Sequence, residues 1–362
     1  MRQRMMLSVA VAAAAALRVT AVMASDAPGA VYVLTNAPAG NAVLVYDRGG
    51  DGSLSAAGIY ATGGAGSGAG LGSQGAVTVS DDGRLLFAVN ASSNTVSSFR
   101  IRSDGLDIVD VVASGGAMPT SVAARGGRVY VLNAGVPNGV SGFTVGVKGQ
   151  MRSISGSNLP LSAASTAPAQ IGFDDEGDTL IVTERGTNRI VTYEVDADGS
   201  LTGPFVHASA GPTPFGFAVD KRNTLFVSEA GAGGGASSYG IGDAGGLDAI
   251  SSMVMTGQRA ACWAVITKNG RFGYVINAGT GNISGFAIGA DGSAKLLNAN
   301  GITATTGGNP TDAALSHDSR YLYVRVAALG QIAVFSIASD GSLTPLPSLN
   351  GTPAGLAGLA AW

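Results

Sequence analysis

The chain has 362 residues, a net charge of −3, 46% hydrophobic residues and 12% charged residues, as is typical of a well-packed soluble protein. No run of Lys or Arg is present, which argues against binding to nucleic acid or to an anionic membrane. The single cysteine, Cys262, excludes an internal disulfide, and its apolar neighbours Ala261 to Val265 indicate a buried thiol rather than a nucleophile.

The first 24 residues have the pattern of a secretory signal peptide. Arg2 and Arg4 precede an apolar, alanine-rich run from Met5 to Leu17, and a small residue, Ala24, offers a cleavage point before Ser25. An uncleaved anchor is the alternative, although the run is short for a membrane span. Cleavage would leave 18 basic and 24 acidic residues, a net charge of −6. We therefore expect a periplasmic or secreted bacterial protein with no membrane attachment, whose body spans residues 25–362.

One short sequence motif, which we call the phrase, recurs seven times in residues 25–362. Each copy has a strand that ends in a polar residue, a tight turn, and a second strand that carries an aromatic residue. These aromatic residues lie 44 to 53 positions apart at Tyr46, Phe99, Phe143, Tyr193, Tyr239, Phe286 and Phe335. A repeat of this length, held over the whole chain, predicts a repeat architecture rather than two separate domains.

Residues 75–112 show what one unit contains. Strands are predicted at 75–79, 85–90, 96–101 and 106–112, separated by an Asp-Asp-Gly-Arg turn, a Ser-Asn turn and an Asp-Gly turn. Seven such four-stranded antiparallel units predict an all-β fold, a seven-bladed β-propeller. The chain opens with a second strand, residues 30–36, and ends with a lone first strand, residues 353–359. These two segments should pair and close the ring.

The loops of this propeller differ between its two faces. Turns between strands one and two and between strands three and four are short and uniform, whereas the other loops vary. The variable loops include residues 63–75, 155–168 and 230–236, and the face that carries them should bind any ligand. Glycine runs in the first and third lack the strand-to-helix context of a phosphate loop.

Two kinds of motif stand out: the Tyr-Val-x-Asn pattern appears at Tyr274 to Asn277, with a similar strand from Val31 to Asn36, and Asp-Gly-Ser-Leu recurs at 51–54, 198–201 and 340–343. These motifs resemble those of lactonase-type seven-bladed propellers, a family that includes bacterial 6-phosphogluconolactonase and carboxymuconate cyclases. The resemblance covers residues 30–362 and implies lactone chemistry. The histidine that the family brings into an inner strand is absent.

The resemblance implies that Glu184, Arg185 and Glu229 are the catalytic candidates. They lie at the ends of second strands in blades four and five, where other blades carry asparagine. A carboxylate there could activate water against a lactone carbonyl while Arg185 stabilises the oxyanion. Alternatively, the glutamates could form an interblade salt bridge or cap backbone N–H groups.

Three further residues are candidate ligand contacts: Arg259, in the crossover before an inner strand, and the strand-end residues Asn133 and Asn277. Arg259 could equally be a solvated surface residue. The two histidines lie far apart in the sequence and give no metal-binding spacing, so neither a metal nor another cofactor is expected.

Two functions fit this pattern. The first is a lactonase-like enzyme that hydrolyses or forms a small sugar or organic-acid lactone. The second is a non-catalytic propeller that has lost the family's active site and binds a ligand or a protein partner. The fold alone does not choose between them.

Overall fold

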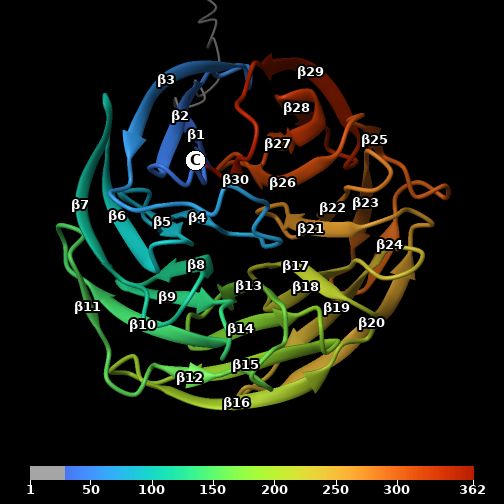
Figure 1. Cartoon of the computed structure of the whole chain (residues 1–362). Coiled ribbons are helices and arrows are strands. Elements are labelled where there is room, and N and C mark those ends of the chain that lie inside the picture. Colours follow the sequence, from blue (N-terminus) through green and yellow to red (C-terminus); the bar gives the residue numbers. More distant parts are fainter. Residues whose placement is uncertain (1–28) are drawn as a thin grey trace, which may run out of the picture.

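In the computed structural model, which describes residues 29–362, the chain forms a ring of seven antiparallel sheets. The sheets surround a central axis like blades, and the chain visits them in order around the ring (Figure 1). The predicted all-β, seven-bladed propeller is therefore confirmed. The signal peptide predicted for residues 1–24 lies outside the described residues. Within residues 29–362, no helix has the length and apolar character needed to cross a bilayer.

The blades are numbered here in chain order. Blade 1 contains β1 (Gly29–Leu34), β2 (Ala42–Arg48), β3 (Leu54–Ala61) and β30 (Ala357–Ala361). Blade 2 contains β4 (Val77–Val79), β5 (Leu85–Asn90), β6 (Thr95–Arg102) and β7 (Gly105–Ala113). Blade 3 contains β8 (Pro119–Arg125), β9 (Arg128–Asn133), β10 (Gly139–Val145), β11 (Met151–Ser153) and β12 (Leu159–Pro160). Blade 4 contains β13 (Pro168–Phe173), β14 (Thr179–Glu184), β15 (Arg189–Val195) and β16 (Leu201–Ala208).

The remaining three blades complete the ring. Blade 5 contains β17 (Pro214–Val219), β18 (Thr224–Glu229), β19 (Gly235–Ile241) and β20 (Leu247–Met255). Blade 6 contains β21 (Ala261–Ile266), β22 (Phe272–Asn277), β23 (Asn282–Ile288), β24 (Ala294–Leu296) and β25 (Ala304–Thr305). Blade 7 contains β26 (Pro310–Leu315), β27 (Tyr321–Val326), a single 3₁₀ turn η1 (Ala327–Leu329), β28 (Gln331–Ile337) and β29 (Leu343–Asn350). The outer strands of blades 3 and 6 are thus each split into two short pieces.

The ring closes by pairing the two ends of the described chain. β30 lies antiparallel to β1, with Val31 opposite Ala361 and Val33 opposite Leu359. The predicted closing strand, residues 353–359, lies a few residues too early. Gly355 has a left-handed φ of +80°, so the chain still turns there and becomes extended only at Ala357.

Tyrosines in the second strands of the blades, which precede the repeated aromatic residues of the third strands, hydrogen-bond to the Asp-Gly turns of the next blade. The Tyr130 hydroxyl of blade 3 donates to the Gly199 carbonyl of blade 4 at 2.6 Å. The Tyr274 hydroxyl of blade 6 donates in the same way to Gly341 of blade 7, at 2.8 Å. Each such tyrosine is buried, and burial of a phenol is favourable when its hydroxyl finds a partner. The phrase that marks the repeat therefore also fastens neighbouring blades together.

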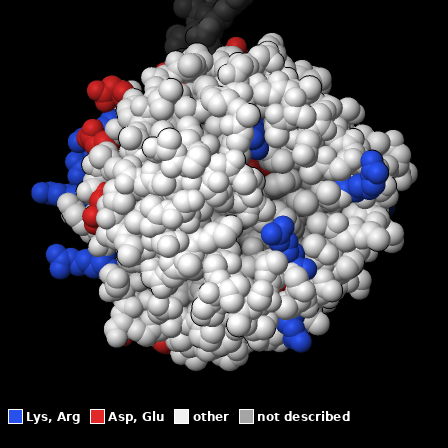
Figure 2. Space-filling model, viewed as in Figure 1, with Lys and Arg blue, Asp and Glu red and all other residues white. Residues whose placement is uncertain are grey.

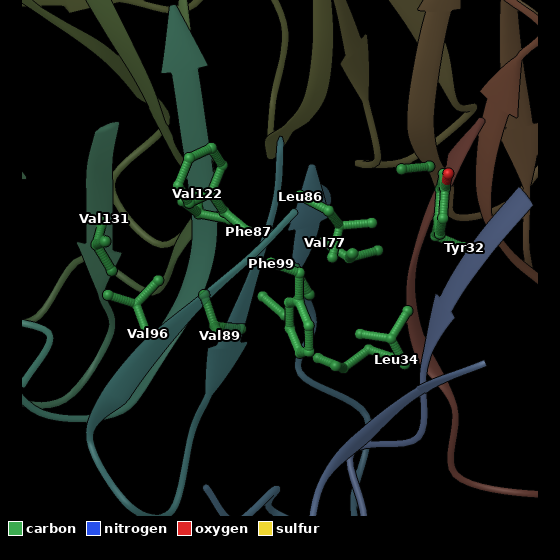
Figure 3. Close-up of a cluster of buried hydrophobic side chains, with 14 of the residues drawn as sticks. Tyr32, Leu34, Val77, Leu86, Phe87, Val89, Val96, Phe99, Val122 and Val131 are labelled. Atoms are coloured by element: carbon green, nitrogen blue, oxygen red, sulfur yellow. The ribbon is translucent and has the colours of Figure 1, made fainter. Parts of the chain in front are cut away.

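Apolar side chains fill the space between the blades. Figure 3 shows one such cluster, in which residues from blades 1, 2 and 3 point toward one another. Phe87 and Phe99 of blade 2 are each 1% exposed, and Leu34 and Val131 reach them from either side. Inner strands such as β5 and β9 are buried on both faces, because each blade packs against a neighbour on either side.

The crossover from β3 to β4 lies across the centre of the ring, where Figure 1 shows it extending toward β21. Gln74 joins three blades there. Its backbone N–H donates to Ala169, its Nε2 donates to the Ala264 carbonyl at 2.8 Å, and its Oε1 accepts from the Ala264 N–H at 3.0 Å. The Trp263 indole donates to the Ser73 carbonyl at 3.0 Å. The central axis is therefore crossed by a fixed segment of chain.

Candidate functional site

The asparagine that usually ends the second strand of a blade makes side-chain hydrogen bonds within that blade. The Asn90 amide donates to Thr95 and to Ser97 at 3.0 and 2.8 Å. The Asn277 amide donates to Asn282 and to Ser284, both at 2.8 Å. In both blades the amide ties the end of the second strand to the third strand.

Glu184 occupies this position in blade 4 and is fully buried. Its carboxylate accepts hydrogen bonds from the Ser162 backbone N–H at 2.9 Å, the Ser162 hydroxyl at 2.5 Å and the Thr187 hydroxyl at 2.6 Å. Its oxygens are thus engaged by the loop before β13 and by the β14–β15 turn.

Glu229 occupies the same position in blade 5 and is also fully buried. Its Oε1 accepts from Ser209 and Ser237 at 2.8 and 2.6 Å, whereas Oε2 has no hydrogen-bond partner among the described residues. Burial raises the pKa of Glu229 to about 7, against the lowering effect of the Ser237 and Ser209 hydroxyls and the Gly211 backbone. Its surroundings are the third strand and the crossover of its own blade.

Arg185 points the other way, toward the ring axis. Its Nε donates to the Ala167 carbonyl at 3.2 Å, and its guanidinium carbon lies 5.5 Å from the centroid of Phe215. A β-carbon placed on Gly72 would lie 2.9 Å from both terminal nitrogens, so the guanidinium packs against the crossover backbone. The structure therefore separates Arg185 from Glu184 and Glu229, and a catalytic role for the two glutamates stays a prediction.

The three predicted ligand contacts lie in different places. Arg259 is exposed and donates to the Gly279 carbonyl at 3.1 Å. Asn133 lines a hollow of about 390 Å³ beside Asn138 in blade 3. Asn277 is buried in the strand-end arrangement described above. Their ligand-binding roles stay predictions.

A different set of residues surrounds a hollow of about 240 Å³ near the ring axis, which we call the central hollow. Figure 2 shows a depression near the middle of this face, with basic and acidic atoms beside it on a mostly uncharged surface. The central hollow is lined by Gly70, Leu71, Gly72, Ser73, Trp263, Thr311, Asp312, Arg325, Leu356, Ala357 and Gly358. Arg185 adjoins it across Gly72. Its volume, just below the range usual for drug-sized ligands, suits a single-ring molecule.

Asp312 is the acidic group of the central hollow and is 3% exposed. It lies in a β-bulge, where β26 loses register between Pro310 and Ala313, and it has a left-handed φ of +67°. Bulges commonly re-aim side chains beside functional sites. Oδ1 accepts from the Ala313 N–H at 2.9 Å, whereas Oδ2 has no hydrogen-bond partner among residues 29–362. Burial raises the pKa of Asp312 to about 7, although Ala313, Arg325 and Leu359 act to lower it.

Arg325 is the basic group of the central hollow and is 7% exposed. Its Nη1 donates to the Thr311 hydroxyl, while Nε has no hydrogen-bond partner in the described part of the chain. Burial lowers the pKa of Arg325, and the charge of Asp312 raises it. An arginine and an aspartate that influence each other, each with an unsatisfied buried atom, are unusual in a folded core and favour a functional role.

The sequence does contain a feature that marks Arg325 of this pair, although the repeat pattern makes it easy to overlook. Arg325 stands in the strand Tyr321 to Val326, at the place where other blades carry Val89, Leu132 or Ile276. A single charged residue inside an otherwise apolar strand is therefore the feature that could have indicated this site.

The model of the family "Lactonase, 7-bladed beta-propeller" matches residues 138–258 and 226–355, more than half of the chain. A search of curated proteins found no match.

Solved structures with the same fold include the periplasmic gluconolactonase of Pseudomonas aeruginosa. It is 19% identical, with a TM-score of 0.73 over 91% of this chain and 98% of that one. A Bacteroides fragilis protein, provisionally assigned as a 6-phosphogluconolactonase, is 17% identical, with a TM-score of 0.74 over 92% and 98%. A Lactobacillus plantarum protein is 15% identical, with a TM-score of 0.75 over 92% and 99%. At these identities the likeness shows the fold.

Proposed function

Because this chain belongs to the lactonase family of seven-bladed β-propellers, we propose that it hydrolyses a small lactone in the central hollow. The observation that carries the proposal is the buried pair of Asp312 and Arg325, which lines that hollow with one unsatisfied atom on each side chain. Two such groups cost folding free energy, which supports a role for them in binding or chemistry.

In the proposed reaction Asp312 is the general base. A pKa near 7 allows its carboxylate to take a proton from water at neutral pH while that water attacks the lactone carbonyl. Arg325 would stabilise the negative charge that develops on the carbonyl oxygen. When the tetrahedral intermediate collapses, the ring C–O bond breaks and Asp312 returns its proton to the leaving oxygen. The product is the open hydroxy acid.

Arg185 keeps the anion-binding role that the sequence predicts, but toward a substituent of the substrate. Its guanidinium lies against Gly72 and Phe215, at the edge of the central hollow. Phe215 in turn packs edge-on against Trp263, which lines the central hollow, with ring centroids 5.3 Å apart. The base role, which the sequence assigns to Glu184 or Glu229, passes in this proposal to Asp312, because Asp312 lines the central hollow and the two glutamates do not.

We also propose that the mature protein begins near Ser25 and acts outside the cytoplasm. The N-terminal pattern supports this, and the Pseudomonas aeruginosa relative is named as periplasmic. Amino-terminal sequencing of the protein from the periplasm or medium would test it, and an intact Met1 terminus on exported protein would contradict it.

A panel of sugar and organic-acid lactones, followed by pH-stat titration of the acid released, tests the function. We expect at least one lactone to hydrolyse well above the buffer rate, and Arg185→Ala to raise KM for lactones that carry an anionic group. Arg152→Ala is the matched control, since it removes an exposed arginine that neither lines the central hollow nor is a predicted ligand contact. A panel without any excess over buffer, with correctly folded protein, would favour the binding-module alternative.

A further inference from the structure

We propose that a second hollow, between blades 4 and 5 on the face opposite the central hollow, binds an extended organic diamine or polyamine. We call it the acidic hollow. It measures about 310 Å³ and lies among the short turns of β13–β14, β15–β16 and β19–β20. This site is independent of the proposed lactonase activity.

The acidic hollow is lined by several acidic side chains and by no basic side chain. Its acidic members are Asp174, Glu176, Asp178, Glu194, Asp196 and Asp243, and no lysine, arginine or histidine lines it. Surface carboxylates are ordinarily interspersed with cations, so a concave group of one sign attracts and concentrates ligands of the opposite sign.

Asp174 gives a second, independent indication of a cation-binding site. The side chain is 1% exposed, and Oδ1 accepts from the Gly177 and Thr179 N–H groups at 2.7 and 3.1 Å. Oδ2 is buried and has no hydrogen-bond partner within residues 29–362. Burial, and then the neighbouring carboxylate of Asp178, raise the pKa of Asp174. A cation in the acidic hollow would relieve the repulsion between these two carboxylates.

The geometry favours an organic cation over a bare metal ion. Among the described residues, no three acidic, histidine or cysteine side chains converge closely enough to hold a metal ion. At about 310 Å³ the acidic hollow falls in the size range of small-molecule sites and is far larger than a single ion needs. Val195 and Ile241 line the same hollow, so methylene groups between separated ammonium groups would find apolar contacts.

Isothermal titration calorimetry of the full mature chain with spermidine and with 1,5-diaminopentane tests the proposal, in low salt and with calcium chloride as a separate titrant. We expect saturable binding of the amine with one molecule per chain. The double variant Asp174→Asn/Asp178→Asn should weaken it at least tenfold, while the amide oxygen at position 174 can still accept the two turn N–H groups.

The control double variant Asp47→Asn/Asp104→Asn removes the same charge from exposed positions in blades 1 and 2 and should leave the affinity unchanged. A second test variant, Glu176→Gln/Asp243→Asn, alters only exposed members of the acidic hollow, so the conclusion does not depend on folding around Asp174. Three results would overturn the proposal: no saturable binding, equal weakening by the control variant, or stoichiometric calcium binding that excludes the amine.

Discussion

Asp312→Asn should greatly slow lactone hydrolysis and at the same time make the protein more stable at pH 8. Loss of a general base typically lowers kcat/KM by about 100-fold to 10,000-fold, and we expect a loss in this range. Asparagine tolerates the left-handed φ of +67° at this position, so the bulge should persist. The variant therefore removes the ionisable group without removing the shape of the central hollow.

The stability gain follows from the pKa of Asp312. The folded pKa of about 7 lies above the ordinary aspartate pKa of 3.8, so folding favours the protonated form. That advantage is complete below pH 3.8 and is lost as the pH rises to about 7. At pH 8 the charged carboxylate should cost roughly 2–4 kcal/mol, which the neutral asparagine avoids. Urea unfolding at pH 8 and pH 4 measures this, and the gain should be present only at pH 8.

Glu229→Gln is the matched control for this prediction. Burial raises the pKa of Glu229 to about 7 as well, so glutamine should also stabilise the protein at pH 8. Glu229 lies away from the central hollow, however, and the variant should keep wild-type kcat/KM. If Glu229→Gln lost activity and Asp312→Asn kept it, the base would be Glu229, as the sequence predicts.

A chain that ends at Gly351 should fail to fold cooperatively. Truncation removes β30, whose Leu359 is 4% exposed, together with Leu356 at 2% and the whole ladder with β1. Burying the two leucines contributes about 1.5–3 kcal/mol each, and the unpaired edge of β1 adds a further cost. Such a loss is comparable to the 5–15 kcal/mol that stabilises a typical domain.

Differential scanning calorimetry would detect this loss as a missing or strongly lowered unfolding transition. Adding a synthetic peptide of residues 352–362 should restore the transition, because the peptide can pair with β1 from outside. A truncated chain that unfolds with the same enthalpy and Tm as the full chain would show that β30 does not hold the ring closed.

The repeat was sufficient to predict the fold because each blade carries the same strand and turn motifs. A tyrosine in the second strand and an Asp-Gly turn in the next blade recur in the sequence, and the structure joins them through hydrogen bonds such as Tyr323 to Gly52 at 3.1 Å. Ring closure was predictable for the same reason, since the first blade lacked a strand that the last residues could supply. The exact start of β30 was not predictable, because it depends on a turn at Gly355.

The candidate site was only partly predictable. Arg185 was found because it stands beside a strand end, and it does adjoin the central hollow. Asp312 was missed because its direction depends on a β-bulge, which shifts the alternation of side chains and cannot be read from residue spacing. Glu184 and Glu229 differ from asparagine in charge, but they keep its structural position. A residue that differs from the repeat pattern therefore need not belong to the functional site.

A crystal structure with a lactam analogue of the best lactone substrate tests the central claim most directly. A lactam has the ring and carbonyl of the lactone but hydrolyses far more slowly, so it should remain intact. We predict that its ring occupies the central hollow between Gly72 and Trp263, with its carbonyl facing Asp312 and Arg325. An active enzyme that binds the lactam elsewhere, and leaves the central hollow without it, would contradict this account.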